Sequence, residues 1–162
     1  MKRYLRPMLL AASAILSLAA IHVNAAVTVN FTKPDAYIDI GFSSWEKDKV
    51  MKDLSEHFHK LGAQLPQGQD LKIEVLDIDL AGRIEPRFST IGYDIRVLRG
   101  GVDWPMIQLR YSIESAGKVV KSGEARVADM SYLHNFNRYN AGEPLRYEKR
   151  MLDNWFKTVV KE

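Results

Sequence analysis

Two aspartates lie two positions apart near the end of an alternating apolar stretch. The stretch is LKIEVLDIDLAG, residues 71–82, and the aspartates are Asp77 and Asp79. Side chains two apart on a strand share one face of a sheet. The pair could therefore hold a hard cation or act as a general acid and base. The structural alternative is that the two carboxylates bond loop backbone at the strand end, or pair with Arg83 and Arg96.

The alternation of this stretch changes phase in its middle. Apolar residues occupy one phase up to Val75 and the opposite phase from Ile78 onward. A shift of one residue moves every later side chain to the other face of a sheet. A β-bulge near residues 76–77 would restore a single buried face. Without a bulge, the two aspartates would continue the buried row, so their orientation depends on this one feature.

Glu148 is the third carboxylate of interest. On a helix expected at residues 144–160, it lies about 40° from Leu152 and therefore inside the apolar stripe. A carboxylate in that position needs a partner. One interpretation is a poised acid in a cleft. The one we favour is an ion pair with a sheet arginine, Arg96 or Arg110, that fixes the helix to the sheet.

Residues 129–143 form an expected loop that is polar but contains several aromatic and basic side chains. These are Tyr132, His134, Phe136, Arg138 and Tyr139. Such residues carry binding energy when they cluster, and loops often carry function. The candidates for contact with a ligand or partner are Tyr132, His134 and Arg138. The alternative, which stays open, is that the aromatic rings cover the open end of the core.

Signatures of catalysis and metal binding are missing from the sequence. There is no G-x-S-x-G, S-x-x-K or phosphate-binding loop motif. The chain contains no cysteine. His57 and His59 would lie about 200° apart on a helix, whereas two histidines that share one ion on a helix are four residues apart. We therefore assign no catalytic residue, no metal ligand and no cofactor.

Residues 1–25 have the pattern of a cleaved signal peptide. Three basic residues precede a short apolar run at residues 8–21, and Val23 and Ala25 occupy the −3 and −1 positions of a cleavage site. The apolar run is shorter than the ~20 residues that a spanning helix needs. We expect export to the bacterial periplasm, no membrane span after cleavage, and a single domain at residues 26–162.

The expected cleavage changes the charge balance. It removes three of the 23 basic residues, and the 20 that remain are matched by 20 acidic ones. A neutral protein has no general attraction to nucleic acid. We therefore expect no nucleic-acid partner.

Hydrophobic periodicity predicts an α+β fold. Strands are expected near residues 27–32, 71–80, 93–97, 107–113 and 119–127, and helices near 44–61 and 144–160. The order βαββββα indicates a two-layer sandwich with a mostly antiparallel sheet of about five strands. Both helices should cover one face, and the last three strands should form an antiparallel meander.

Several of these segments resemble an uncharacterised bacterial family, domain of unknown function 3016. The likeness lies in VTVNFTKPDAYIDI at residues 27–40, in LKIEVLDIDLAG, in residues 94–97, in LRYEK at residues 145–149, and in Leu152 and Trp155–Phe156. It covers essentially the whole mature chain. The resemblance implies an exported protein made of this domain alone, and it implies no activity.

Two functions follow from these observations. The first is a non-enzymatic protein of the periplasm or cell envelope that binds a protein partner or a small ligand. The alternative is a hydrolase that uses Asp77, Asp79 and Glu148, with or without a divalent cation. Convergence of these carboxylates in a pocket would favour the hydrolase, whereas separate partners for each would favour the binding protein. The sequence does not indicate an oligomeric state.

Overall fold

The computed structural model describes residues 25–85 and 95–161. The expected signal segment lies outside this range except for Ala25. The elements in chain order are β1 (Val27–Phe31), a short 3-10 helix η1 (Pro34–Ala36), α1 (Ser44–Gly62), β2 (Gln69–Asp79), β3 (Arg83–Glu85), β4 (Ile95–Val97), β5 (Met106–Ser115), β6 (Lys118–Ala128) and α2 (Arg146–Lys161). No helix in the described part of the chain is long and apolar enough to cross a membrane.

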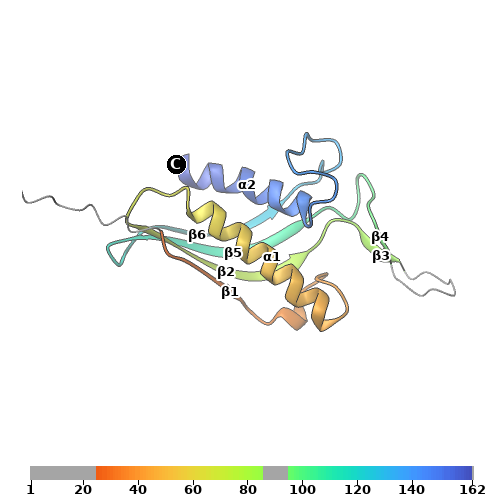
Figure 1. The fold of residues 1–162 in the computed structure, drawn as a ribbon, viewed down its shortest axis with the longest axis horizontal. Coiled ribbons are helices and arrows are strands. Elements are labelled where there is room, and N and C mark those ends of the chain that lie inside the picture. The colour runs from red at the N-terminus through yellow and green to blue at the C-terminus, as the bar shows by residue number, and fades with distance from the viewer. Residues whose placement is uncertain (1–24, 86–94, 162) are drawn as a thin grey trace, which may run out of the picture.

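Four strands form the main sheet, in the order β1-β2-β5-β6. β1 runs parallel to β2, and the other neighbours are antiparallel. Both long helices cover one face of this sheet (Figure 1). The predicted α+β sandwich, with a mostly antiparallel sheet and two helices on one face, is therefore confirmed.

The expected meander is wrong in its first strand. β4 pairs with β3 in a separate two-stranded ribbon instead of joining β5. Gly82 follows β2 with a φ of 81°, a conformation that glycine adopts without strain. It turns the chain out of the sheet, and an added Cβ there would lie 2.5 Å from the carbonyl oxygen of Val97. Alternation identified the strand near residue 95 but not its partner.

α1 begins at a capping box formed by Ser43 and Glu46. The Ser43 hydroxyl accepts a hydrogen bond from the Glu46 N–H, and the Glu46 carboxylate accepts one from the Ser43 N–H. Because both groups satisfy backbone donors, the helix starts at a defined residue. The side chains on its buried side include Leu54, Phe58 and Leu61. This side packs toward β1 and β2 and forms one wall of the core.

The core fills the layer between the helices and the sheet. Its members from the sheet include Leu71, Ile73, Val75, Ile78, Ile107 and Leu109, and those from α2 include Leu152 and Phe156. The other face of the sheet carries charged cross-strand contacts. Arg110 on β5 contacts both Glu74 on β2 and Glu124 on β6. One apolar and one charged face explain the two-layer arrangement.

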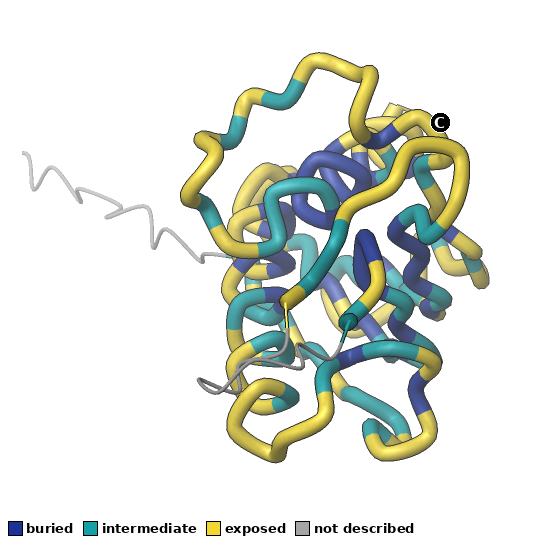
Figure 2. Tube along the Cα trace, turned by 90° about the vertical axis from the view of Figure 1, so that its right-hand side faces the viewer, coloured by how far each residue is buried: buried dark blue, intermediate teal, exposed yellow. Residues whose placement is uncertain are grey.

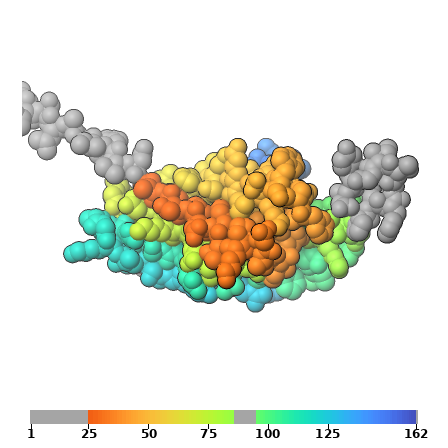
Figure 3. All heavy atoms as spheres, turned by 90° about the horizontal axis from the view of Figure 1, so that it is seen from below, coloured from red at the N-terminus to blue at the C-terminus, as the bar shows by residue number. Residues whose placement is uncertain are grey.

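The two ends of the sandwich differ. Residue 25 and the end of α2 lie at one end (Figure 1). The other end, called here the distal end, contains segment 37–43, the β3–β4 ribbon, the first turns of α1 and α2, and loop 129–143. Figure 2 views the distal end face on, with exposed loop segments around a buried centre. Figure 3 shows that β1, η1 and the first half of α1 form the surface along the β1 side.

Candidate functional site

The predicted β-bulge is present in β2. The register with β5 shifts between Val75 and Asp77. After the bulge, Ile78 pairs with Ile107 and both are fully buried, whereas Asp77 pairs with Gln108. Asp77 and Asp79 therefore lie on the sheet face that points away from the helices.

Asp77 acts as a backbone acceptor. Its Oδ1 accepts hydrogen bonds of 2.9 Å from the N–H groups of Ile38 and Ile78. These bonds hold segment 37–40 alongside the end of β2, where Asp39 also bridges to Asp79. Burial raises the pKa of the Asp79 carboxyl, and the negative charges of Asp39 and Asp77 raise it further. The Asp77 side chain thus anchors a loop, as the structural alternative supposed, whereas Asp79 meets this loop through a backbone bridge.

Glu148 lies on the opposite, helix-facing side of the sheet. It is only 3% exposed, and its Oε1 accepts a 2.8 Å hydrogen bond from the N–H of Ala81. Burial raises the pKa of its carboxyl. The expected ion pair is wrong, because Arg96 pairs with Asp39 and Arg110 lies on the charged face of the sheet. The helix is instead linked to the segment that follows β2, because the Glu148 carboxylate accepts from the backbone N–H of Ala81.

Arg96 on β4 organises the centre of the distal end. Its two terminal nitrogens bond the Asp39 carboxylate at 2.7 and 3.0 Å. It also donates to the carbonyl oxygens of Ala81 and Gly82. A bidentate pair of this kind is strong and directional. Arg83, the other arginine proposed near the aspartates, is exposed on β3.

Loop 129–143 is held by one arginine that the sequence reasoning did not single out. Arg150 on α2 contacts the Asp129 carboxylate and donates to the carbonyl oxygens of Tyr132, Asn135 and Phe136. Its side chain is 6% exposed. Removal of a partner from a buried guanidinium is strongly destabilising, because it leaves an uncompensated charge in the interior. These contacts thus hold residues 129–136 around the Arg150 side chain.

The three candidates in this loop have different surroundings. Tyr132 is buried, and its hydroxyl both donates to the Arg99 carbonyl oxygen and accepts from the Arg99 N–H. His134 is exposed. Arg138 contacts Asp153 on α2 at 2.7 Å. Tyr132 therefore covers the core as the alternative supposed, whereas Phe136 does not, since it is 89% exposed.

A second buried polar cluster joins the two helices. His57 Nε2 on α1 lies 3.1 Å from Asp153 Oδ1 on α2. Asp153 Oδ2 accepts a 2.8 Å hydrogen bond from the Tyr139 hydroxyl. Burial raises the pKa of Asp153, but the contacts with His57 and Tyr139 outweigh burial and keep it below 3.8. His57 and Asp153 are buried and line neither of the two hollows described below, which favours a structural role.

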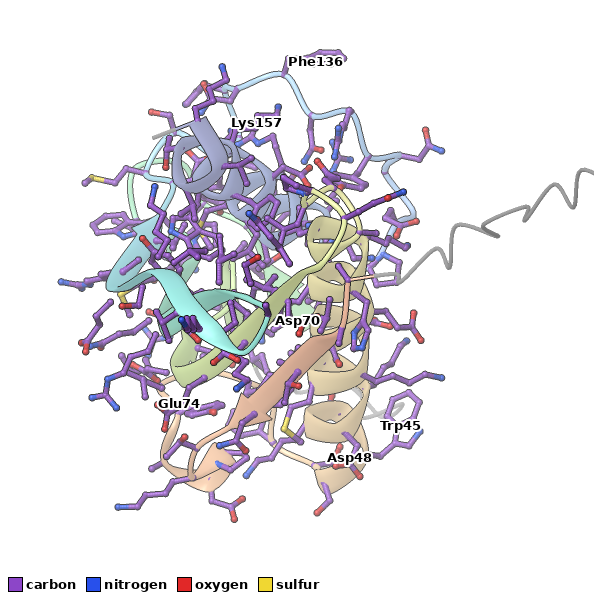
Figure 4. All side chains as sticks on the ribbon, turned by 90° about the vertical axis from the view of Figure 1, so that its left-hand side faces the viewer. Trp45, Asp48, Asp70, Glu74, Phe136 and Lys157 are labelled. Atoms are coloured by element: carbon purple, nitrogen blue, oxygen red, sulfur yellow. The ribbon has the colours of Figure 1, made fainter. Side chains whose placement is uncertain are left out.

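A hollow of the distal end lies beside the first turns of α1. It has a volume of about 630 Å³. We call it the distal groove. Its lining is mainly apolar: Ile40, Phe42, Trp45, Val50, Leu80, Ile84, Pro144 and Leu145. Phe42 and Trp45 are 75% and 71% exposed, and Figure 4 shows Trp45 pointing outward from the start of α1. Charged side chains of both signs also line the groove: Lys49, whose ammonium lies 5.4 Å from the Trp45 ring, Arg96, Glu46 and Asp53.

A smaller hollow of about 250 Å³ adjoins the distal groove. The two share Leu80, Arg96 and Leu145 as walls. We call the smaller one the α2 hollow, because Arg146, Tyr147 and Glu148 of α2 line it. The two hollows are the candidate site. In the described ranges, no group of three or more acidic or histidine side chains is arranged to hold a metal ion.

Sequence reasoning missed most of this site. Phe42 precedes the capping box and Trp45 lies within it, and their exposure cannot be read from periodicity. Arg146 was named only as part of a family segment. A signal was present, since two large aromatic residues occur within four positions at a helix start. Of the proposed site residues, the structure brings only Arg96 and Glu148 into the candidate site.

Comparisons with known proteins found a distant structural similarity and a matching family model. A solved structure of a minor lipoprotein from Acinetobacter baumannii is similar at 12% identity, over 86% of this chain and 90% of that chain, with a TM-score of 0.26. That TM-score is too low to bear on the fold or the site. No curated protein matches. The model of the family described as "Protein of unknown function (DUF3016)" matches residues 25–158, so the chain belongs to that family.

Proposed function

We propose that this protein is a non-enzymatic binding protein of the bacterial cell envelope, and that its ligand occupies the distal groove. One observation carries the proposal. Two large aromatic side chains, Phe42 and Trp45, stand exposed on the wall of an apolar hollow of about 630 Å³. Hollows of about 300–1,000 Å³ with apolar walls and a few polar groups are typical of small-molecule sites.

Exposure of these two rings is costly for the unbound protein. Burial of one large apolar side chain contributes roughly 1.5–3 kcal/mol, and folding gains little of that here. Contiguous apolar surface of this kind is typical of contact sites. A ligand that covers Phe42 and Trp45 would recover this free energy on binding.

The geometry gives no support to the hydrolase alternative. Asp77 and Asp79 lie on one face of the sheet and Glu148 lies on the other. Asp77 is occupied by two backbone donors, and Glu148 by one. A general acid and base must reach the same substrate. These three carboxylates therefore cannot act together.

The envelope location rests on the sequence pattern of residues 1–25. It is tested by expression of the full chain in bacteria, followed by mass spectrometry of the protein in a periplasmic extract. A mature chain that starts at Ala26 is expected. Recovery of the protein only from the cytoplasm, with residues 1–25 still attached, would contradict this location.

The distal groove is tested with N-phenyl-1-naphthylamine, a neutral apolar dye that fluoresces when it is buried. We expect saturable binding to the wild-type protein. Combined Phe42→Ala and Trp45→Ala substitutions should weaken binding at least about tenfold, because two apolar contacts are lost. The rings are exposed, so the melting temperature should stay close to that of the wild type.

Phe136→Ala is the matched control. Phe136 is an exposed aromatic residue that does not line either hollow, and Figure 4 shows it far from Trp45. This variant should bind the dye like the wild type. Equal loss of affinity in the control and in the double variant, or no loss in either, would show that the dye does not occupy the groove.

A further inference from the structure

Most charges around the α2 hollow are already compensated. Arg96 is bound in two places by Asp39. Glu143 lies 2.6 Å from the ammonium of Lys149, which keeps the pKa of that carboxyl below its ordinary value. Each of these pairs is neutral as a unit. Neither pair leaves a charge for a ligand.

Glu148 is engaged by the fold and not by a cation of the hollow. It is almost fully buried, and its Oε1 accepts the 2.8 Å hydrogen bond from the Ala81 N–H. Burial raises the pKa of its carboxyl. Within the described residues, Glu148 makes no ion pair with Arg96 or Arg146.

Arg146 is the charge that remains. It is the first residue of α2 and lines the α2 hollow. Within the described residues, its guanidinium makes no ion pair, and its buried Nε atom has no hydrogen-bond partner. Its charged group lies 5.0 Å from the Tyr147 ring. A half-buried guanidinium that lines a hollow and makes no ion pair in the described part of the chain is suited to a carboxylate.

The apolar walls continue from this charge into the distal groove. Leu80 and Leu145 line both hollows, and beyond them lie Phe42 and Trp45. Arg96, the polar residue between the hollows, already bonds one carboxylate and two carbonyl oxygens. The amide groups of a peptide that lay beside Arg96 would find few hydrogen-bond partners, and unpaired buried amides are costly. An alkyl chain would pass without that cost.

We propose that the two hollows together bind an amphipathic monocarboxylate with a flexible alkyl chain. Its carboxylate pairs with Arg146 in the α2 hollow, and its chain crosses Leu145 and Leu80 to cover Trp45 in the distal groove. This proposal rests on the proposed function, because it uses the distal groove as the apolar part of the site.

The test compares three ligands that share one chain and differ in their head group. Dodecanoate, dodecan-1-ol and dodecyltrimethylammonium are titrated calorimetrically at neutral pH, the two ionic ligands below their micelle concentrations and dodecan-1-ol below its solubility limit. Wild-type protein should bind dodecanoate at least about tenfold more tightly than dodecanol, since a charged hydrogen bond is worth more than one factor of ten. Dodecyltrimethylammonium should bind most weakly.

Arg146→Gln should remove the preference for the carboxylate and leave the affinity for dodecanol unchanged. Arg146→Lys should restore part of the preference. Lys157→Gln is the matched control, because it removes one positive charge from an exposed site on the same helix. This control should keep the full preference, which excludes an effect of net charge alone.

The outcomes separate the two proposals. Equal binding of dodecanoate and dodecanol by the wild type would overturn the carboxylate inference and leave the apolar groove standing. Tighter binding of the cationic ligand would overturn it as well. Failure of all three ligands and of the neutral dye would overturn the proposed function itself. Displacement of dodecanoate by an equal concentration of N-acetyl-trileucine would contradict the proposal. It would indicate that the site takes a peptide C-terminus instead of an alkyl chain.

Discussion

The buried carboxyl of Glu148 on α2 accepts a hydrogen bond from the backbone N–H of Ala81, two residues beyond the end of β2. This contact joins the last helix to the strand that carries the β-bulge. It also forms part of the wall of the α2 hollow. One residue therefore serves both the packing of the helix and the shape of the candidate site.

Glu148→Gln should keep the protein folded and change its pH dependence. The amide oxygen can still accept from Ala81, but the group no longer ionises. In the wild type, burial raises the folded-state pKa above its ordinary value of 4.5. The stability from this group is therefore complete below 4.5 and is lost as pH rises through the raised pKa. Urea unfolding over a pH series should show a smaller decline for the variant.

Glu148→Ala and Glu56→Gln complete this experiment. The alanine variant leaves the Ala81 N–H without a partner and should cost about 2 kcal/mol of unfolding free energy. Glu56 is exposed on α1, so its substitution should leave the decline unchanged. A Glu148→Gln variant whose stability fell with pH as steeply as that of the wild type would show that Glu148 is not the source of the decline.

Asp77 should be more important as a hydrogen-bond acceptor than as a charge. Asp77→Asn can keep an oxygen toward Ile38 and Ile78, whereas Asp77→Ala leaves both N–H groups unpaired. We expect a loss of about 1–3 kcal/mol for alanine and a smaller one for asparagine. The measurement is the unfolding free energy in urea. Equal losses for the two variants would reject the acceptor role.

Asp79→Asn provides the comparison at the neighbouring carboxylate. The pKa of Asp79 is raised by burial and by Asp39 and Asp77. Removal of its charge at neutral pH should therefore leave stability unchanged or increase it. The Asp77→Asn, Asp79→Asn double variant should remain folded.

The fold was predictable where one pattern had one physical solution. The change of phase after Val75 required a bulge, because otherwise two aspartates would have faced the core. The spacing of Ser43 and Glu46 indicates the start of α1, because the two side chains satisfy each other's backbone N–H groups there. Each of these depends on residues close in sequence. The partner of β4 does not, since it is set by the turn at Gly82 and by pairing with β3.

The candidate site was less predictable because it depends on which partners remain unfilled. Glu148 was expected to bond Arg96, but Asp39 bonds that arginine. Nothing in the local sequence of Asp39 indicates this contact, which joins residues 57 positions apart. That Arg146 makes no ion pair within the described residues becomes evident only after Glu143 has been assigned to Lys149. Such assignments need the tertiary structure.

Asp153 should make the protein sensitive to acid. Its pKa is raised by burial, but contacts from His57 and Tyr139 bring it below its ordinary value of 3.8. Its contribution is therefore present above 3.8 and is lost as pH falls through the lowered pKa. Asp153→Asn should lose about 3 kcal/mol at neutral pH and show a shallower acid transition by circular dichroism. Asp48→Asn, at an exposed site on α1, should keep the wild-type acid transition.

Arg150 should control the order of loop 129–143. Arg150→Met removes four charge-assisted bonds, one to the Asp129 carboxylate and three to carbonyl oxygens. We therefore expect a loss of about 3–5 kcal/mol of unfolding free energy. Arg150→Lys keeps the charge but cannot reach Asp129 and three carbonyl oxygens in a fixed fork. Hydrogen exchange should therefore increase at residues 129–136 in both variants, and more strongly in the methionine variant.

Asp129→Asn in the Arg150→Met background tests the cause of that loss. Asp129 is nearly buried beside Arg150, so without the guanidinium its charge is uncompensated. The second substitution should recover part of the unfolding free energy, because it removes a buried unpaired charge. It should not restore slow hydrogen exchange in the turns around Tyr132, Asn135 and Phe136. The carbonyl oxygens of these residues still lack the Arg150 donor. Additive losses in the double variant would mean that the ion pair is not coupled, and that Arg150 holds the loop through its backbone contacts alone.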